Sequence, residues 1–456
     1  MSYRTAPTPT TGMPSGVPYI IGNEAAERFS FYGMRAILYA FMTTALVTHE
    51  GAADLMSKPE ASKWFHWFVA AAYTTPLIGG QLADLWLGKY RTIILLSLVY
   101  CLGHLALAID HTRVGLTVGL SLIALGAGGI KPCVSAHVGD QFGTTNAHLL
   151  PRIFNWFYFS INVGAAISML LTPWLLKYTS PHIAFGVPGI LMFIATVVFW
   201  MGRHQFIHIP ADPRGFAREF ASSTFRRALA WLIGLYILIA AFWAVFDQTG
   251  SRWVAQAEHM DRKIFGMKIL PSALQSANPF FVLLLIPFFT FIIYPAVERF
   301  TSFTPLRRIG TGFLITAGTL GISMAIETWI AAGQTPTIWW QILAYLLLTS
   351  AEIMISITAL EFSYTQAPVR LKSFIMSLYM FLSVALGNGF TALVNAYIEK
   401  TNDGGLEGSD YYAFFLKVLL ATFAVFLVTS VFYKEKHYIQ EEALDHPDDP
   451  SEAPNV

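Results

Sequence analysis

The chain has 456 residues and a formal net charge of +1, with 55% hydrophobic and 12% charged residues. A soluble domain carries about 25% charged residues, so this composition, with a mean hydropathy of +0.52, excludes a soluble protein and indicates a polytopic membrane protein. The near-zero net charge gives no support for a nucleic-acid partner. Cys101 and Cys133 lie in apolar runs and predict packing residues, with no disulfide framework.

Apolar runs follow a polar N-terminus that is rich in Pro, Thr and Gly and has no apolar core with a cleavage site, so it predicts a disordered tail rather than a secretory signal. A span needs about 20 mostly apolar residues. Runs of this kind predict twelve transmembrane helices, near 19–47, 63–86, 91–109, 115–138, 152–176, 183–202, 229–250, 278–298, 309–330, 338–362, 373–398 and 411–433.

The loops predict the orientation and the domain organisation. An even number of spans places both termini on one side, and the excess of Lys and Arg in the loops of that side predicts that it is cytoplasmic. The longest of these connections divides the spans six and six, and similar basic loops follow spans 2 and 8, which indicates a duplicated bundle around a central cavity. The expected domains are a disordered tail 1–17, a six-helix bundle 18–202, a cytoplasmic linker 203–227, a second six-helix bundle 228–435, and an acidic disordered tail 436–456.

Span 1 begins with four charges in the segment NEAAERFSFYGMR. An ionised side chain at bilayer depth costs roughly 2.5–3.5 kcal/mol, so such residues normally pair or face water. Glu24 and Arg28 stand one helical turn apart and can pair, and Arg35 follows two turns later on nearly the same face. The set is either a static salt bridge or a switch in which protonation of Glu24 or Glu27 releases Arg28. Two carboxylates beside one arginine favour the switch.

Two more charges lie deep in apolar spans. Lys131, in ALGAGGIKPCVSAHVGDQF, predicts an anchor for a carboxylate, a switchable partner of span 1, or both. Glu352, in LLLTSAEIMISITALEF, predicts a seat for an ammonium group, whereas Glu361 is expected to be structural. With Arg35 and Lys131 in the first bundle and Glu352 in the second, the charges favour a zwitterion that bridges the two halves.

Other polar residues in the spans have alternative interpretations. His66 and Asp247 fall near the outer ends of their helices and predict proton transfer, with packing as the alternative for the histidine. Asn162 and Asn278 predict hydrogen bonds either to a peptide-like backbone or between helices. The aromatic residues that predict side-chain pockets, with packing as the alternative, are Tyr32, Tyr73 and Trp243.

Several long segments resemble the signatures of the proton-dependent oligopeptide transporters, the POT family of the major facilitator superfamily. NEAAERFSFYGMR resembles its E-x-x-E-R-F-x-x-Y-G signature, and GGQLADLWLGKYRTI, GAGGIKPCVSAHVGDQF and FYFSINVG are similar to three others. FWAVFDQTGSRW, SANPFF and AEIMISITALEFSYTQAP are similar to the mammalian members. The resemblance implies an all-α major facilitator fold with 12 transmembrane helices. It also implies proton-coupled import of di- and tripeptides by alternating access, without a cofactor and without enzymatic activity.

The resemblance also implies residue roles. Peptide binding is implied for Tyr32, Arg35, Tyr73, Lys131, Asn162, Trp243, Asn278 and Glu352, with the carboxylate on Arg35 and Lys131 and the amine on Glu352. Proton coupling and gating are implied for Glu24, Glu27, Arg28, His66, Lys131, Asp247 and Ser251. The expected partners are peptides, protons and the lipid bilayer. The expected location is the bacterial inner membrane with both termini cytoplasmic, and no nucleic acid or oligomer is required.

The chain also departs from the family. The linker is too short for the two extra helices of many bacterial members, and only AGQTPT stands where mammalian members carry an outer domain. Phe31-Tyr32 replaces the usual tyrosine pair. The alternative function is proton-coupled transport of nitrate, a carboxylate or a glycoside by the same fold, which Glu352 disfavours because an anion carrier has no use for a buried carboxylate. A membrane enzyme or receptor has no support from any metal-ligand cluster, nucleophile–base pair or cofactor loop.

Overall fold

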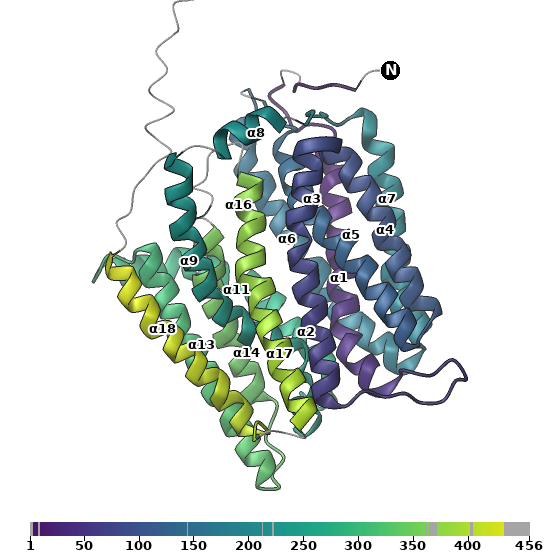
Figure 1. The fold of residues 1–456 in the computed structure, drawn as a ribbon, viewed down its shortest axis with the longest axis vertical. Helices are drawn as coiled ribbons and strands as arrows, with labels where there is room; N and C mark the ends of the chain where they lie inside the picture. The colour runs from purple at the N-terminus through teal and green to yellow at the C-terminus, as the bar shows by residue number, and fades with distance from the viewer. Residues whose placement is uncertain are drawn as a thin grey trace, which may run out of the picture.

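The structure, a computed structural model, describes residues 3–7, 10–143, 145–211, 213–220, 223–360, 363, 372–401 and 405–432. The expected acidic tail 436–456 and Glu361 lie outside these residues. Long helices run roughly side by side, with those from the first half of the chain on one side of the molecule and those from the second half on the other (Figure 1).

The first bundle is built from the helices up to residue 204. They are α1 (Val17–Thr44), α2 (Lys58–Thr74), α3 (Pro76–Leu82), the π-helical turn η1 (Ala83–Leu87), α4 (Lys89–Ile109), α5 (Arg113–Gly139), the 3₁₀ turn η2 (Ala147–Leu149), α6 (Leu150–Tyr178), α7 (Pro181–Met201) and the 3₁₀ turn η3 (Gly202–His204). Side chains at the N-termini help to start them: Ser57, Thr112 and Ser180 each accept a hydrogen bond from a backbone N–H in the first turn of α2, α5 and α7.

The second bundle follows the short helix α8 (Pro213–Phe220). Its elements are α9 (Ser223–Phe246), η4 (Asp247–Gly250), α10 (Arg252–Glu258), β1 (Lys263–Ile264), β2 (Met267–Lys268), η5 (Ser272–Ser276), α11 (Ala277–Phe288), η6 (Phe289–Ile293), α12 (Tyr294–Glu298), α13 (Pro305–Ala331), α14 (Trp339–Glu352), η7 (Ile353–Ile357), α16 (Lys372–Tyr379), η9 (Met380–Ala385), α17 (Leu386–Thr401) and α18 (Ser409–Phe432). The strands β1 and β2 form an antiparallel hairpin. The turns η6, η7 and η9 are π-helical and interrupt three spans.

Each predicted span falls on one of these helices or on a helix with an interruption. Ten of the described helices are long and apolar enough to cross a membrane, and α1 and the α2–α3 pair complete the expected twelve. Two structural features fall within the segments expected as linker and as N-terminal tail. The segment expected as linker contains α8 and the start of α9. Residues from the expected N-terminal tail make defined contacts, since the ring of Tyr3 stacks on that of His208 with centroids 4.0 Å apart.

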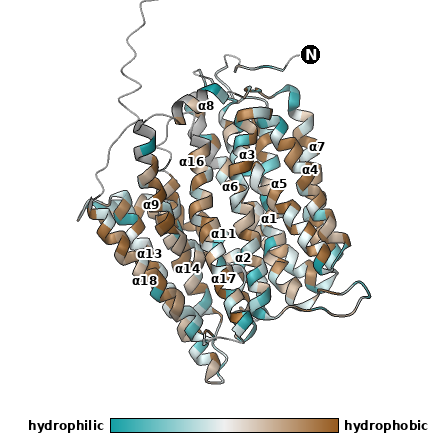
Figure 2. Ribbon diagram, in the orientation of Figure 1, coloured by the Kyte–Doolittle hydropathy of each residue, from teal (hydrophilic) through white to brown (hydrophobic). Residues whose placement is uncertain are grey.

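The outward faces of the helices are apolar, as contact with lipid requires (Figure 2). In α4, Leu98, Leu102 and Leu105 are about half exposed, while Tyr100 and His104 on the other face are buried. A soluble monomer rarely exposes so much contiguous apolar surface. The helix faces therefore agree with the multi-pass membrane protein that the composition predicts.

Close approach of backbones holds the first bundle together. A Cβ atom at Gly79 in α3 would lie 2.3 Å from the carbonyl oxygen of Gly129 in α5, so α5 leaves no room for a side chain at position 79. Small residues of this kind allow membrane helices to pack closely where apolar burial gives little driving force. The contact fixes the segment of α5 that carries Lys131.

The two bundles meet along a seam. We call the end of the molecule with the N-terminus and α8 the proximal end, and the end with the α1–α2 connection the distal end (top and bottom of Figure 1). Toward the distal end, α17 packs along α2, and η5 packs on α6. At the proximal end, α16 packs against α3 and α5.

Candidate functional site

A central cavity of about 210 Å³ lies on the seam between the bundles. Its first-bundle lining comes from α1 and α6 and its second-bundle lining from α9, α11, α14 and η7. The polar and aromatic lining residues are Tyr32, Tyr158, Asn162, Trp243, Asn278, Glu352 and Ser356. Five of these, all except Tyr158 and Ser356, are residues that the sequence predicted for substrate binding.

Glu352 contributes the carboxylate of this cavity and stands at the end of α14, directly before the π-helical turn η7. Asn278 of α11 donates from Nδ2 to Glu352 Oε2 at 2.7 Å and to Thr349 Oγ1 at 3.1 Å. Among the residues that the structure describes, no Lys, Arg or His side chain lies within ion-pair distance of Glu352. A carboxylate held by a neutral amide and bordering a cavity can accept a cationic group.

Asn162 and Asn278 differ in their contacts, although the same two interpretations apply to both from sequence alone. Asn278 bonds across to α14, as interhelical contacts do. Asn162 lines the cavity from α6, and its Nδ2 donates to the carbonyl oxygen of Tyr158 in its own helix at 3.0 Å. Among the described contacts, Asn162 makes no interhelical hydrogen bond.

Lys131 lies in α5, outside the cavity lining, and its side chain is buried. Its Nζ is 3.8 Å from the ring centroid of Phe31 and 4.2 Å from that of Tyr73. In the described part of the chain, Nζ has no hydrogen-bond acceptor. The cation is thus held by two aromatic faces, and within the described residues no carboxylate lies within ion-pair distance of it.

The charges at the start of α1 form a buried cluster. Arg28 Nε lies 2.7 Å from Glu24 Oε1 and 3.0 Å from Glu27 Oε2. The predicted i, i+4 pair is confirmed, and both carboxylates share one guanidinium. Arg35, two turns on, takes no part in this cluster, because its guanidinium Nη2 donates to Asp247 Oδ1 of the second bundle.

That ion pair is part of a polar network that joins the bundles on the distal side of the cavity. His66 of α2 lies with Nε2 3.0 Å from Ser251 Oγ and with Nδ1 2.7 Å from Asn388 Oδ1. Asn388 of α17 also donates from Nδ2 to Asp247 Oδ2 at 2.6 Å. The structure thus brings together His66, Asp247 and Ser251, which the sequence associated with proton entry, and adds Arg35 to them.

Sequence reasoning missed other parts of the seam. Asn388 is a polar residue between two glycines in an apolar run, a signal of the same kind as that of Asn162 and Asn278, which could have marked it. Lys63 Nζ of α2 lies 2.5 Å from Glu399 Oε2 of α17 nearer the distal end. No local pattern marks that pair, because its partners come from different bundles.

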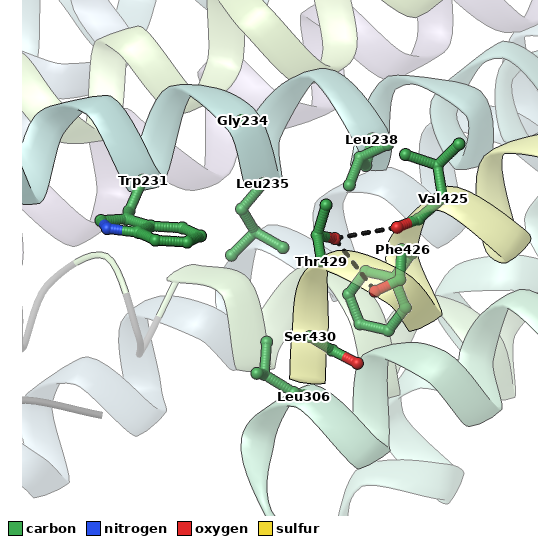
Figure 3. Close-up of a pocket in the computed structure, with 9 residues that line it drawn as sticks. All are labelled: Trp231, Gly234, Leu235, Leu238, Leu306, Val425, Phe426, Thr429 and Ser430. Atoms are coloured by element: carbon green, nitrogen blue, oxygen red, sulfur yellow. Dashed lines mark hydrogen bonds between the residues drawn. The ribbon is translucent and has the colours of Figure 1, made fainter. Parts of the chain in front are cut away.

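A second hollow, of about 250 Å³, lies on the outside of the second bundle between α9, α13 and α18 (Figure 3). Its lining is Trp231, Gly234, Leu235, Leu238, Leu306, Val425, Phe426, Thr429 and Ser430. The Thr429 hydroxyl donates to carbonyl oxygens of its own helix, and so does that of Ser430. No charged residue is among the described residues that line this hollow, whereas the central cavity is lined by Glu352 and by residues of both bundles, which makes the central cavity the candidate site.

Within the described residues, no group of three or more His, Cys, Asp or Glu side chains is arranged to hold a metal ion. The seam carries hydrogen-bonding and ionisable side chains, among them Glu352, His66 and Asp247. These groups can bind a charged polar molecule and can take up or release protons.

Known proteins resemble this chain both in sequence and in structure. The sequence profile of the family described as "PTR2: POT family" matches residues 90–226 and 217–408. Peptide transporter family 1 of Drosophila melanogaster is 36% identical over 368 residues, which cover 70% of this chain and 48% of that protein. Solute carrier family 15 member 2 of Homo sapiens is 36% identical over 375 residues, which cover 70% of this chain and 50% of that protein. The chain thus spans about half the length of these relatives.

Solved structures match over nearly the whole chain. The crystal structure of the POT family transporter PepTSo superimposes with a TM-score of 0.82 at 35% identity, covering 93% of this chain and 100% of that one. A structure described as an auto inhibited POT family peptide transporter gives a TM-score of 0.84 at 33% identity, covering 94% and 99%. The expected fold, with two helical bundles around a central cavity, is confirmed by these superpositions.

Proposed function

Because the chain belongs to the POT family, we propose that it is a membrane symporter that carries di- and tripeptides together with protons by alternating access. The observation that carries the proposal is the central cavity, which has the carboxylate of Glu352 on one bundle and the polar groups of Tyr32 and Asn162 on the other. A site of this kind, at the interface of two repeats, suits a substrate that contacts both halves.

Glu352 is the proposed seat of the peptide amine. Its carboxylate now accepts a hydrogen bond from the neutral amide of Asn278. An ammonium group would add a charge-assisted hydrogen bond, which is about twice as strong as a neutral one. Asn278 would then orient the carboxylate, and Asn162 would bond the peptide backbone. Trp243 would contact a peptide side chain.

Arg35 and Lys131 are the proposed anchors of the peptide carboxylate, with Tyr32 and Tyr73 beside them. Neither cation lines the cavity, so peptide binding must bring the carboxylate toward them or draw them inward. Arg35 is paired with Asp247, which means that the peptide carboxylate and Asp247 would compete for one guanidinium. Among the described contacts of Lys131, no carboxylate would compete with the peptide for its ammonium group.

Protons are the proposed coupling ion, and no prosthetic cofactor is required. Protonation of Glu24 or Glu27 would weaken their hold on Arg28 and so change the packing of α1. His66, Asp247 and Ser251 would serve proton entry, because they lie together on the distal side of the cavity. Substrate and protons together would have to favour one arrangement of the bundles over the other for transport to be coupled.

Lys and Arg are in excess in the loops of the proximal side, which favours a cytoplasmic location for both termini. The proposed direction of transport is import through the inner membrane of a bacterial cell. Inward movement of one proton yields about 2.3 kcal/mol per 100 mV of membrane potential, which can drive peptide uptake. One chain carries the whole cavity, so transport would not require an oligomer.

Uptake of labelled dialanine into liposomes under an imposed pH gradient tests the proposal. We expect accumulation that a proton uncoupler abolishes. Uptake that is absent, or that is indifferent to the uncoupler, would reject proton-coupled peptide transport. Accumulation of nitrate or a glycoside in place of dialanine would favour the alternative substrates.

Glu352→Gln tests the amine seat in the same assay. We expect it to reduce uptake of peptides with a free N-terminus by about tenfold or more, because a charge-assisted hydrogen bond is lost, and to change uptake of N-blocked peptides little. Glu327→Gln is the matched control, since Glu327 accepts from Gln256 within the second bundle at 3.0 Å and does not line the cavity. Equal losses for free and blocked peptides would remove the assigned role of Glu352.

A further inference from the structure

Asn388 lies at the junction of the seam, in the first turn of α17 after the π-helical turn η9. Its side chain is fully buried. The preceding Gly387 lets the backbone of α17 meet that of α9, because a Cβ atom there would lie 2.3 Å from the carbonyl oxygen of Ala240. Asn388 is therefore held against α9 on one side while its amide reaches α2 on the other.

The hydrogen-bond partners of Asn388 fix which way its amide points. Nδ2 lies 2.6 Å from Asp247 Oδ2 and 2.9 Å from the carbonyl oxygen of Val384. A carboxylate and a carbonyl can only accept, so both must face the NH₂ group. Oδ1 must therefore face His66 Nδ1, at 2.7 Å. Because an amide oxygen cannot donate, His66 carries a hydrogen on Nδ1.

This tautomer leaves Nε2 as the basic nitrogen of neutral His66. Ser251 Oγ lies 3.0 Å from Nε2 and can donate its hydrogen there. The same hydroxyl lies 3.5 Å from the carbonyl oxygen of Gln248, a second acceptor. When a proton from water adds to Nε2, the new N–H donates to Ser251 Oγ, and the hydroxyl hydrogen turns toward Gln248. Each protonation state of His66 thus has a complete set of partners.

We propose that Asn388 is a positioning residue of the proton-entry site, which selects Nε2 of His66 as the proton acceptor and keeps the imidazole apart from Asp247. The inference rests on the proposed function and adds to it a residue that the sequence did not indicate. Asn388 acts as a neutral spacer, with His66 on its oxygen and Asp247 on its nitrogen.

The charges around Asn388 explain why His66 and Asp247 need to be kept apart. Asp247 of η4 is bound by Arg35 of α1 through its other oxygen. The guanidinium of Arg252 in α10 is engaged within the second bundle, where it donates to Asn395 Oδ1 at 2.8 Å. A protonated His66 would therefore stand beside an ion pair, Arg35 with Asp247, that is already formed. A direct contact with Asp247 would compete with Arg35, so the spacer links proton uptake to the ion pair between the bundles.

Asn388→Ala and Asn388→Asp test the proposal in liposomes, with dialanine uptake measured between about pH 5 and pH 8, the range in which histidine titrates. Peptide counterflow without a pH gradient is measured in parallel, because it reports binding and movement of the carrier without net proton flow. Asn395→Ala is the matched control. Asn395 is equally buried two turns further along α17, and its contacts with Arg252, Tyr411 and Thr391 all stay within the second bundle.

We expect Asn388→Ala to lower proton-driven uptake by about tenfold or more and to change its pH dependence, because a buried histidine and a buried carboxylate each lose a partner. Counterflow should stay within about twofold of wild type, since the cavity is untouched. Asn388→Asp should move the pH dependence upward, because two adjacent carboxylates favour retention of a proton. Asn395→Ala should keep the wild-type pH profile.

A parallel loss of uptake and counterflow in Asn388→Ala, or an unchanged pH profile in both Asn388 variants, would overturn the assignment. Wild-type uptake that ignores an uncoupler would instead reject the proposed proton coupling itself. The two failures are therefore distinguishable in one set of vesicles.

Discussion

Two adjacent glycines in α3 should respond very differently to the same substitution. A Cβ atom at Gly79 would lie 2.3 Å from the carbonyl oxygen of Gly129 and 2.4 Å from its Cα, whereas one at Gly80 would meet Ser377 Oγ at 3.4 Å and Pro132 Cγ at 3.9 Å. Contacts between heavy atoms are favourable at about 3.5–4.0 Å. Gly79→Ala therefore overlaps backbone by about 1 Å, while Gly80→Ala makes ordinary contacts.

The overlap at Gly79 cannot be relieved by a side-chain rotation, because both clashing atoms belong to the backbone of α5. Overpacking of this kind costs about 1–3 kcal/mol. At about 3 °C per kcal/mol for a unit of this size, the melting temperature should fall by about 3–10 °C. Gly80→Ala should stay within about 2 °C of wild type, because Gly80 is buried but an added methyl group meets no atom closer than 3.4 Å, so the change in stability should be about 0.5 kcal/mol or less.

Thermal unfolding in detergent, followed by tryptophan fluorescence, measures both variants. Dialanine uptake should fall with Gly79→Ala as well, because Lys131 stands two residues beyond Gly129 on α5 and would shift relative to Phe31 and Tyr73. Equal melting temperatures for the two variants, or a larger loss for Gly80→Ala, would refute the reasoning.

Three further predictions follow from other contacts. Lys131→Gln should abolish dialanine uptake while leaving the melting temperature equal or higher, because it removes a buried cation that has no described acceptor; a large loss of stability would contradict this. Lys63→Gln should lower the free energy of unfolding by only about 0.2–1 kcal/mol, because the ion pair with Glu399 is partly exposed. If this pair helps to close the distal end, the double charge reversal Lys63→Glu with Glu399→Lys should show the uptake of wild type. Asp54→Asn should lower the melting temperature at pH 7, because the hydrogen bond from Arg113 holds the pKa of the Asp54 carboxyl below its usual range; the folded-state pKa is the lower one, so the difference between variant and wild type should vanish as the pH falls through it.

Much of the fold and part of the site could be predicted from the sequence. Apolar runs located every span, because a bilayer imposes a minimum length on any helix that crosses it. The pair of Glu24 and Arg28 was predictable because the helix itself sets their distance. Glu352, Asn162 and the other predicted lining residues stood out as polar or aromatic groups in apolar segments, where each needs a reason.

Contacts across the seam could not be predicted in the same way. Arg35 pairs with Asp247, 212 positions away, and His66 meets Asn388 across 322 positions. These contacts depend on how two separately folded bundles are set against each other, which no local spacing encodes. Lys131 illustrates another limit, since its charge marked it as an anchor for a carboxylate or a switchable partner of span 1, but no local pattern indicated its contacts with the rings of Phe31 and Tyr73.

The π-helical turns have a consequence for how the two halves can move. Three of them, η6, η7 and η9, lie within spans of the second bundle. A π turn holds one residue more than an α turn, so converting it to regular helix rotates the segment beyond it by about 100°. Glu352 directly precedes η7, and Asn388 follows η9 by three residues. Local changes of helix type in the second bundle can therefore re-aim Glu352, the proposed amine seat, and the seam contact of Asn388.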